Sequence, residues 1–271
     1  MSAIIEVASV TVQVKTATLI ENLSLTIETG ETVAIVGPNG AGKSTLMRVL
    51  SGDLSPSAGT VRLKNREVRD YAADDLAANR AVLSQHIQVT FPFTVDEIVR
   101  MGGSQHPAAT VQQMVGPTLA ECDLGAFARR EIPTLSGGEQ QRAHFARVLV
   151  QSACGELQSG PGVLLLDEPT SSLDLKHQLN LLESARRRAD RGTAVIAVLH
   201  DLNLAARFAR RIIVLHRGRL VADGTPSETI TNAIMHDVFG IDAEIGTTRD
   251  DVPYVLPQSM TISGTGAGAT R

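Results

Sequence analysis

The chain has 271 residues, a length that fits one large domain or two small ones. Hydrophobic residues make up 43% and charged residues 20%, and 25 basic residues against 29 acidic ones leave a net charge of −4. These values exclude wholesale disorder and argue against a surface that coats nucleic acid. Aromatic residues account for only 3% and tryptophan is absent, so we expect a folded protein with an aliphatic core.

The longest apolar run, AVIAVL at 194–199, has the length of a strand and is far below the roughly 18 residues that cross a bilayer. The first residues, MSAIIEVASV, place no basic segment before an apolar core, so the sequence predicts no secretory signal. Cys122 and Cys154 are far apart and form no CxxC motif, which argues against a disulfide framework or a zinc site. We expect a chain that neither spans a membrane nor is exported.

The N-terminal part predicts strands followed by a strand–loop–helix unit. Apolar residues alternate through the first 30 positions, as in half-buried strands. Residues 32–36 (TVAIV) predict a short buried strand, and a helix is expected over 43–50 after the glycine-rich segment 37–42. A further short strand is expected over 60–63.

The middle of the chain, residues 95–149, is predicted to be mostly helical. Breaks are expected at glycine and proline positions, namely Gly102-Gly103, Pro107 and Ile132-Pro133. Residues 151–162 (QSACGELQSGPG) predict a loop rich in glycine and serine.

Strand patterns return in the C-terminal half, at 163–166 and 193–199, followed by a helix over 202–210 and a hairpin over 212–221. The tail, 261–271, is expected to be disordered because it can bury little apolar surface. Strands, then helices, then strands predict an α/β core with an inserted helical subdomain.

Residues 37–45 (GPNGAGKST) match the phosphate-loop pattern G-x-x-x-x-G-K-[ST] in full, between a predicted strand and a predicted helix. Glycines let the backbone approach phosphate oxygens, and the helix that begins near Lys43 directs its N–H groups at the anion. Lys43 is expected to reach the β- and γ-phosphates, and Ser44 to bind Mg²⁺. The predicted nucleotide-binding residues here are Gly37, Pro38, Asn39, Gly40, Ala41, Gly42, Lys43, Ser44 and Thr45.

Two carboxylates, Asp167 and Glu168, follow the apolar strand at 163–166. Ligands of open α/β sheets bind at this end of the strands. We expect Asp167 to hold Mg²⁺ and Glu168 to orient or deprotonate the attacking water. His200 follows the strand at 193–199. Its position alone is compatible with a contact to the γ-phosphate and equally with a structural role.

Residues 135–142 (LSGGEQQR) contain a capping box, S-x-x-E, in which Ser136 and Glu139 open a helix expected to run to Leu149. The two glycines inside the box leave backbone N–H groups open to an anion. Beside the phosphate loop and the VLLLDEP strand, this segment resembles the signature of ATP-binding cassette ATPases.

The resemblance covers about residues 4–240. It extends to Gln85 in LSQH, Asp174 in SLD and His200 in LHD, which match the glutamine loop, the D-loop and the switch histidine of that family. It implies a P-loop NTPase fold with a mixed sheet and an N-terminal antiparallel β subdomain. It further implies a single nucleotide-binding domain, 1–260, with a helical subdomain inserted at about 86–155.

The resemblance also implies that two copies dimerise head to tail and sandwich ATP between the phosphate loop of one and the signature of the other. The residues acting from one subunit would be Lys43, Ser44, Gln85, Asp167, Glu168 and His200, with Ser44, Gln85 and Asp167 around Mg²⁺. Those acting from across the interface would be Ser136, Gly137, Gly138, Glu139 and Asp174.

One departure from the family concerns the adenine. Members usually carry an aromatic residue about 25 positions before the phosphate loop, but residues 10–15 read VTVQVK. Val14 is therefore expected to supply only apolar contact, which weakens stacking by roughly 1 kcal/mol and with it the preference for ATP over GTP.

Without a membrane segment, such an ATPase must couple to separate permease subunits. The segment after Gln85 contains Phe91 and Phe93, which either pack in the core or anchor a partner helix. The FPFTV run and the segment 151–162 resemble the ATPases of bacterial hemin importers. LHDLNLAA and VFGI fit the wider group that imports ferric siderophores and cobalamin, and a soluble cassette protein is a third reading.

Hemin import implies two permease subunits, a periplasmic binding protein and a location at the cytoplasmic face of the bacterial inner membrane. The hemin itself is not expected to touch this chain, and no nucleic acid is expected to bind.

Overall fold

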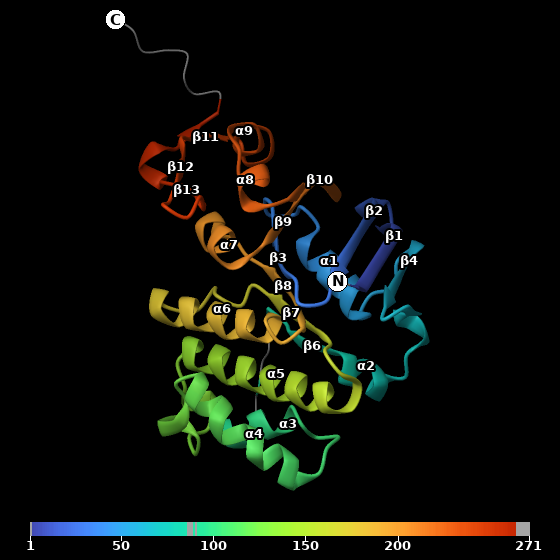
Figure 1. Ribbon diagram of the computed structural model, residues 1–271, viewed down its shortest axis with the longest axis vertical. Coiled ribbons are helices and arrows are strands. Elements are labelled where there is room, and N and C mark those ends of the chain that lie inside the picture. The colour runs from blue at the N-terminus through green and yellow to red at the C-terminus, as the bar shows by residue number, and fades with distance from the viewer. Residues whose placement is uncertain (1, 86–88, 90, 264–271) are drawn as a thin grey trace, which may run out of the picture.

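The computed structural model describes residues 2–85, 89 and 91–263. Its frame consists of two sheets, a four-stranded antiparallel sheet at the N-terminal side and a six-stranded mixed sheet at the centre (Figure 1). The predicted α/β fold with a mixed sheet is confirmed. Among the helices in the described residues, none is long and apolar enough to cross a membrane.

The N-terminal sheet has the strand order β2-β1-β4-β5. Its strands are β1 (Ala3–Val14), β2 (Ala17–Glu28), β4 (Ala58–Leu63) and β5 (Arg66–Glu67). The alternation of buried residues is interrupted where the register shifts, between Val7 and Val10, and Ser9 there has a φ of 49°. This bulge explains why the apolar positions of the sequence skip from 7 to 10.

The central sheet has the strand order β10-β9-β3-β8-β7-β6. Its strands are β3 (Thr32–Val36), β6 (Arg80–Leu83), β7 (Val163–Asp167), β8 (Ala194–Val198), β9 (Arg211–His216) and β10 (Arg219–Gly224). All pairings are parallel except β9 with β10. Every residue of β3, β7 and β8 is buried, because the sheet is covered on both faces.

Helix α1 (Lys43–Ser51) packs between the two sheets, where Leu46 and Leu50 share one apolar cluster with Val33 and Ile35 of β3. The opposite face of the central sheet packs against α5 (Gly137–Ser159), α6 (Leu175–Ala189) and α7 (Leu202–Phe208). Parallel strands therefore end along one edge, and that edge receives the loops after β3, β6, β7 and β8.

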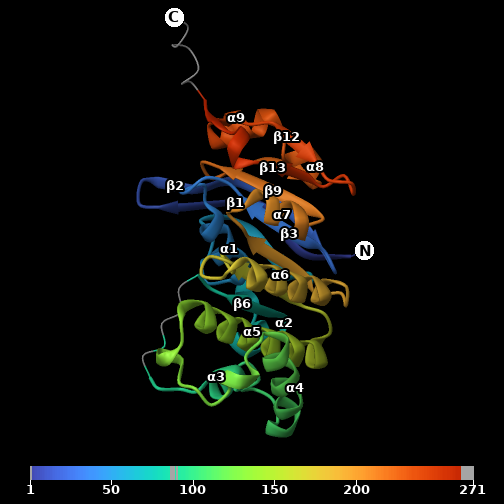
Figure 2. The same cartoon turned by 90° about the vertical axis from the view of Figure 1, so that its left-hand side faces the viewer.

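The helical part lies beyond one end of the central sheet, where α3 (Val95–Met101) and α4 (Ala108–Glu121) pack against α5 (Figures 1 and 2). Helix α2 (Ala73–Asn79) packs against the C-terminal half of α5. Short 3₁₀ turns in the described residues are Val68–Asp70, Gly125–Phe127, Ile132–Thr134 and Pro257–Ser259. The predicted breaks at Gly102-Gly103 and Pro107 agree with the gap between α3 and α4.

The predicted loop at 151–162 is wrong, and so is the predicted end of the helix at Leu149, because α5 continues to Ser159. A Cβ at position 155 would lie 2.2 Å from the carbonyl oxygen of Ala78. Gly155 therefore permits the close approach of α2 and α5 and does not break the helix. The glycine that ends α5 is Gly160, which has a φ of 72°.

The C-terminal unit follows β10 and packs beside α7. Its elements are α8 (Pro226–Thr229), α9 (Asn232–Phe239), β11 (Ile241–Asp242), β12 (Ile245–Thr247), β13 (Pro253–Val255) and β14 (Thr261–Ile262). The prediction of a disordered tail is wrong at its start, because Thr261 and Ile262 pair with β11. Its remainder, 264–271, lies outside the described residues.

Candidate functional site

The phosphate loop joins β3 to α1 and is shaped by three glycines with positive φ, at Gly37, Gly40 and Gly42. A Cβ at Gly37 would lie 2.1 Å from the carbonyl oxygen of Leu215, so only glycine fits this position. Helix α1 begins after Gly42 with no side-chain cap and no acidic residue in its first turn. Its first backbone N–H groups are therefore open to an anion.

Lys43 is buried and curls back over this loop. Its Nζ donates hydrogen bonds to the carbonyl oxygens of Gly37, at 2.8 Å, and Pro38, at 2.9 Å. Burial lowers the pKa of Lys43, whereas the nearby Glu168 and Asp167 raise it. Neutral carbonyl partners are weak for an ammonium group, so a phosphate at the loop can take over its donors.

Asp167 ends β7, and its Oδ1 accepts a hydrogen bond of 3.4 Å from the Ser44 hydroxyl. Burial raises the pKa of Asp167, as does the charge of Glu168, while the Ser44 hydrogen bond and Lys43 oppose the shift. A hydroxyl beside a carboxylate suits Mg²⁺, which prefers oxygen ligands. No group of three or more His, Cys, Asp or Glu side chains in the described part of the chain could hold a metal alone. Phosphate oxygens and water would complete such a site.

The carboxylate of Glu168 contacts two of the predicted residues, which follow the neighbouring strands. Gln85, after β6, donates from Nε2 to Oε2 at 2.7 Å, and His200, after β8, brings its Nε2 to 2.6 Å from Oε1. Glu168 itself has a φ of 51°, an uncommon conformation for a residue with a side chain. His200 thus lies beside the carboxylate, and its contact with the γ-phosphate stays a prediction.

Most of these residues line one cleft, but Asp167, Gly37 and Pro38 are not among its lining residues. The lining residues are Leu19, Asn39, Gly40, Ala41, Gly42, Lys43, Ser44, Thr45, Gln85, Glu168 and His200. Val14, at the end of β1, is 48% exposed and does not line the cleft. Leu19 of β2 does, and it was missed because the pattern of its strand gives no reason to single it out.

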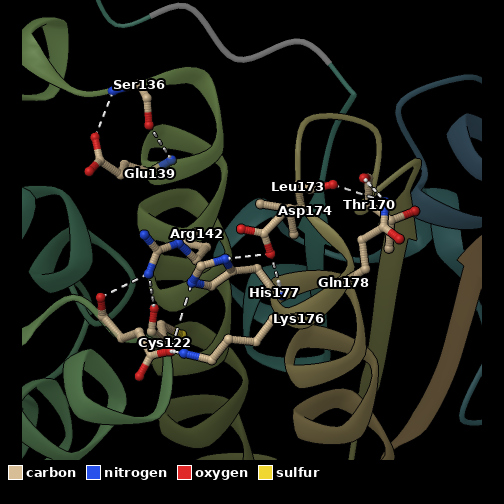
Figure 3. A network of polar contacts seen from close by, with 11 residues as sticks. Cys122, Ser136, Glu139, Arg142, Thr170, Leu173, Asp174, Lys176, His177 and Gln178 are labelled. Atoms are coloured by element: carbon tan, nitrogen blue, oxygen red, sulfur yellow. Dashed lines mark hydrogen bonds and ion pairs between the residues drawn. The ribbon is translucent and has the colours of Figure 1, made fainter.

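The signature segment forms the capped N-terminus of α5, away from this cleft. Ser136 Oγ accepts from the Glu139 backbone N–H at 3.3 Å, and Glu139 Oε2 accepts from the Ser136 N–H at 2.7 Å (Figure 3). The predicted capping box is confirmed. A Cβ at Gly137 would meet no atom within 4 Å, whereas one at Gly138 would lie 2.9 Å from the carbonyl oxygen of Ser172.

Asp174 caps α6 and also lies outside the cleft. Its Oδ1 accepts from the backbone N–H of His177 at 2.9 Å and lies 2.8 Å from Nδ1 of the same ring (Figure 3). The His177 N–H lowers the pKa of Asp174. Gln178 donates to the carbonyl oxygens of Thr170 and Leu173, at 3.1 and 3.0 Å, and so fixes the loop before Asp174. Sequence reasoning missed this role of Gln178.

A second missed residue is Arg142, the last residue of the signature. Its Nη1 donates to the carbonyl oxygens of Cys122 and Asp123, each at 2.8 Å, and so ties α5 to the end of α4 (Figure 3). Phe91 and Phe93, by contrast, are 69% and 36% exposed, with ring centroids 6.2 Å apart. Core packing therefore does not account for Phe91.

Comparison with known proteins identifies the chain's relatives. A family model described as ABC transporter matches residues 20–171. The hemin import ATP-binding protein of Rhodopseudomonas palustris strain BisA53 is 59% identical over 260 residues, 96% of each chain. That of Nitrobacter winogradskyi is 58% identical over 266 residues, 98% of this chain and 99% of the relative.

Two solved structures have the same fold. The dimeric post-hydrolysis structure of an ATP-binding cassette bound to ADP and phosphate has a TM-score of 0.72 at 25% identity, covering 82% of this chain and 98% of that one. A chain from an inward-facing transporter, described as of the metal-chelate type, has a TM-score of 0.75 at 22% identity, covering 96% and 98%. The chain thus belongs to the ATPase family of ABC transporters, whose members bind and hydrolyse ATP.

Proposed function

We propose that this chain is the ATP-hydrolysing, energy-coupling subunit of a bacterial hemin importer. The observation that carries the hydrolytic part is the convergence of Gln85 and His200 on Glu168 at the edge that holds the phosphate loop. Support for the transported substrate comes from relatives 57–59% identical, which are hemin import ATP-binding proteins.

The phosphate loop, residues 37–45, binds the triphosphate of ATP in this proposal. Lys43 exchanges its two carbonyl partners for β- and γ-phosphate oxygens, which are charged and stronger acceptors. Ser44, Gln85 and Asp167 are the proposed side chains around Mg²⁺. When bound, this ion neutralises part of the charge on the phosphates.

Glu168 is the proposed general base. Its carboxylate accepts the proton of the attacking water, and the hydrogen bond from Gln85 holds one of its oxygens in place. His200, whose ring contacts the other oxygen, is the proposed contact to the γ-phosphate once nucleotide fills the cleft. Residues at three strand ends thus fix the orientation of one carboxylate. Catalysis by positioning of the reacting groups requires such a fixed orientation.

The signature segment of a second copy completes each site in this proposal. Ser136, Gly137, Gly138 and Glu139 face the ATP held by the partner, with Asp174 beside them. Gly137 is open to its surroundings, so its backbone can approach a phosphate closely. Val14, exposed at the end of β1, offers apolar contact to the adenine. Hydrolysis is then tied to closure of the dimer.

The proposed partners are two permease subunits, with a periplasmic binding protein joining from the other side of the inner membrane. The chain itself is proposed to lie at the cytoplasmic face. The exposed pair Phe91 and Phe93 is the proposed apolar anchor for a permease helix. Hemin passes through the permease and makes no contact with this chain.

The test is ATP hydrolysis by the chain reconstituted with its permease in lipid vesicles. We expect hemin-loaded binding protein to stimulate ATP hydrolysis. A ferric siderophore or cobalamin, each with its own binding protein, should give no stimulation. If a siderophore or cobalamin stimulated hydrolysis and hemin did not, hemin would be ruled out as the transported substrate. Absence of ATP hydrolysis under every condition would contradict the enzymatic part.

Changing both Phe91 and Phe93 to alanine should abolish the stimulation while leaving basal ATP hydrolysis unchanged. A matched control is Leu157→Ala, because Leu157 is similarly exposed, at 68%, but lies near the far end of α5. Unchanged stimulation in the double variant would remove the anchor from the proposal and leave the ATPase assignment intact.

A further inference from the structure

The helix that follows His200 is short and begins at once. Helix α7 spans only residues 202–208, and Asp201 caps it by accepting from the backbone N–H groups of Asn203 and Leu204 at 2.8 and 3.0 Å. Seven residues are too few for a helix to be stable alone in water. The position of its first turn, and of His200 just before it, therefore depends on what α7 packs against.

One of those neighbours is the C-terminal hairpin of β12 and β13, which lies beside α7 (Figures 1 and 2). Asn203 and Val255 are joined there by two hydrogen bonds. The Val255 backbone N–H donates to Asn203 Oδ1 at 2.8 Å, and Asn203 Nδ2 donates to the Val255 carbonyl oxygen at 3.0 Å. The amide side chain thus pairs with β13 as a third strand would.

Helix α7 and the hairpin of β12 and β13 each depend on the other for stability. Strands β12 and β13 have three residues each, and a two-stranded hairpin of this size is not stable in isolation. Val255 is 1% exposed, so loss of its partner would leave a buried N–H and a buried C=O unsatisfied. The remaining contacts of α7 in the core come from Leu204, Ala205, Ala206 and Phe208, with Leu202 packed against the same cluster. None of these apolar contacts satisfies the backbone of Val255.

We propose that Asn203 is a positioning residue, through which the hairpin of β12 and β13 fixes the first turn of α7 and so holds His200 against Glu168. The C-terminal unit is then part of the hydrolytic machinery although none of its residues up to 263 lines the nucleotide cleft. This inference rests on the role proposed above for His200, and the experiment below separates the two.

The test compares Asn203→Ala, Asn203→Asp and the control Arg207→Ala in the full-length chain, by steady-state ATP hydrolysis. Arg207 is exposed on the last turn of the same helix. We expect Asn203→Ala to lower kcat by about ten-fold or more with little change in KM, since a displacement of about 1 Å costs up to about a hundred-fold. Asn203→Asp keeps the acceptor for the Val255 N–H and should be intermediate.

A second measurement asks whether the effect passes through His200. Single-turnover hydrolysis at high protein concentration is measured for His200→Ala with and without Asn203→Ala. We expect no further loss on combining them, because a displaced histidine and an absent one are equivalent. Amide hydrogen exchange of Tyr254 and Val255 should rise in Asn203→Ala alone, reporting release of the hairpin.

Three results would overturn the inference: Asn203→Ala indistinguishable from Arg207→Ala, an additive loss with His200→Ala, or a defect confined to KM. A His200→Ala variant that hydrolyses ATP normally would instead contradict the role proposed for His200. The inference alone fails if His200→Ala is impaired and Asn203→Ala is not.

Discussion

The carboxyl edge of the central sheet and the N-terminus of α5 are built on opposite plans. At the sheet edge, side chains from three strand ends point into one cleft, and Glu168 holds contacts to Gln85 and His200. At α5, Ser136 and Glu139 satisfy each other, and no cleft residue belongs to that segment. The sheet edge is a cleft whose polar groups can bind a ligand, whereas the polar groups at the start of α5 already have partners within the chain.

That difference supports the proposal that each half is completed by a second copy. Within one chain the signature does not line the nucleotide cleft, so it can serve a nucleotide only by presenting itself to another molecule. The proposed head-to-tail dimer would join the cleft of one chain to the capped helix end of the other, and two such sites would form at once. The following predictions test whether the cleft and the signature act in these separate roles.

The largest effect is expected at the cleft. Glu168→Gln should permit ATP binding but lower turnover by about 10³-fold, because the amide cannot accept the proton of the attacking water. The same variant should accumulate as an ATP-bound dimer in size-exclusion chromatography. Glu183→Gln, an exposed position on α6, serves as the matched control. Full turnover by Glu168→Gln would remove the assignment of the base.

Mixing two inactive variants should restore part of the activity. Lys43→Ala damages the phosphate loop and Ser136→Arg blocks the signature, so each alone should hydrolyse ATP poorly. A mixed dimer contains one site made from the intact loop of one chain and the intact signature of the other. ATP hydrolysis by the mixture should exceed that of either variant alone. A mixture no more active than its components would contradict the head-to-tail arrangement.

A stability difference is expected between two helical glycines. Gly155→Ala should destabilise the chain by about 1–3 kcal/mol, since its Cβ would lie 2.2 Å from the Ala78 carbonyl oxygen. Gly116→Ala in α4 meets no atom within 4 Å and should stabilise by up to about 1 kcal/mol. Urea unfolding of the two variants measures both changes. Equal effects would mean that α2 and α5 do not require the close approach.

The last prediction concerns His144 on α5, whose effect appears only at acidic pH. Its ring is 3% exposed, and burial lowers its pKa to about 4, helped by the charge of Arg147. The folded state therefore holds it neutral while the unfolded chain protonates it below about pH 6.5. The buried neutral ring therefore costs no stability above that pH. As the pH falls from 6.5 to 4, the free energy of unfolding decreases, by about 2 kcal/mol at pH 5.

Urea unfolding at pH 7 and pH 5 measures this loss, with His144→Gln as the variant that cannot titrate. The wild-type chain should lose more stability than the variant over that interval. The same loss in both proteins would exclude His144 as the cause.

Local pattern was sufficient where neighbours in the sequence are also neighbours in space. The strand at 32–36, the phosphate loop and the capping box of Ser136 and Glu139 all follow from short-range rules, and all lie where expected. Contacts between distant segments defeated the same rules. Gly155 looks like a helix breaker until α2 packs against it, and Leu19 enters the cleft only because β2 passes beside the loop.

His200 and Asn203 show a second limit. A histidine after an apolar strand has the same sequence environment whether it faces a carboxylate or the core, and only the order of β7 and β8 in the sheet brings it to Glu168. The role of Asn203 was likewise invisible, because its partner Val255 is 52 positions away and offers only backbone atoms.

The missing side chain at Gly138 has a consequence for how the two nucleotide sites of a dimer sense each other. Its Cα faces the Ser172 carbonyl, in the loop that begins directly after Glu168, and Gln141 of the same helix donates to the Pro169 carbonyl at 3.3 Å. The proposed base and the signature segment are thus joined by direct contacts within one polypeptide. In the proposed dimer, a shift of the loop after Glu168 at one nucleotide would therefore also move the signature that serves the other nucleotide.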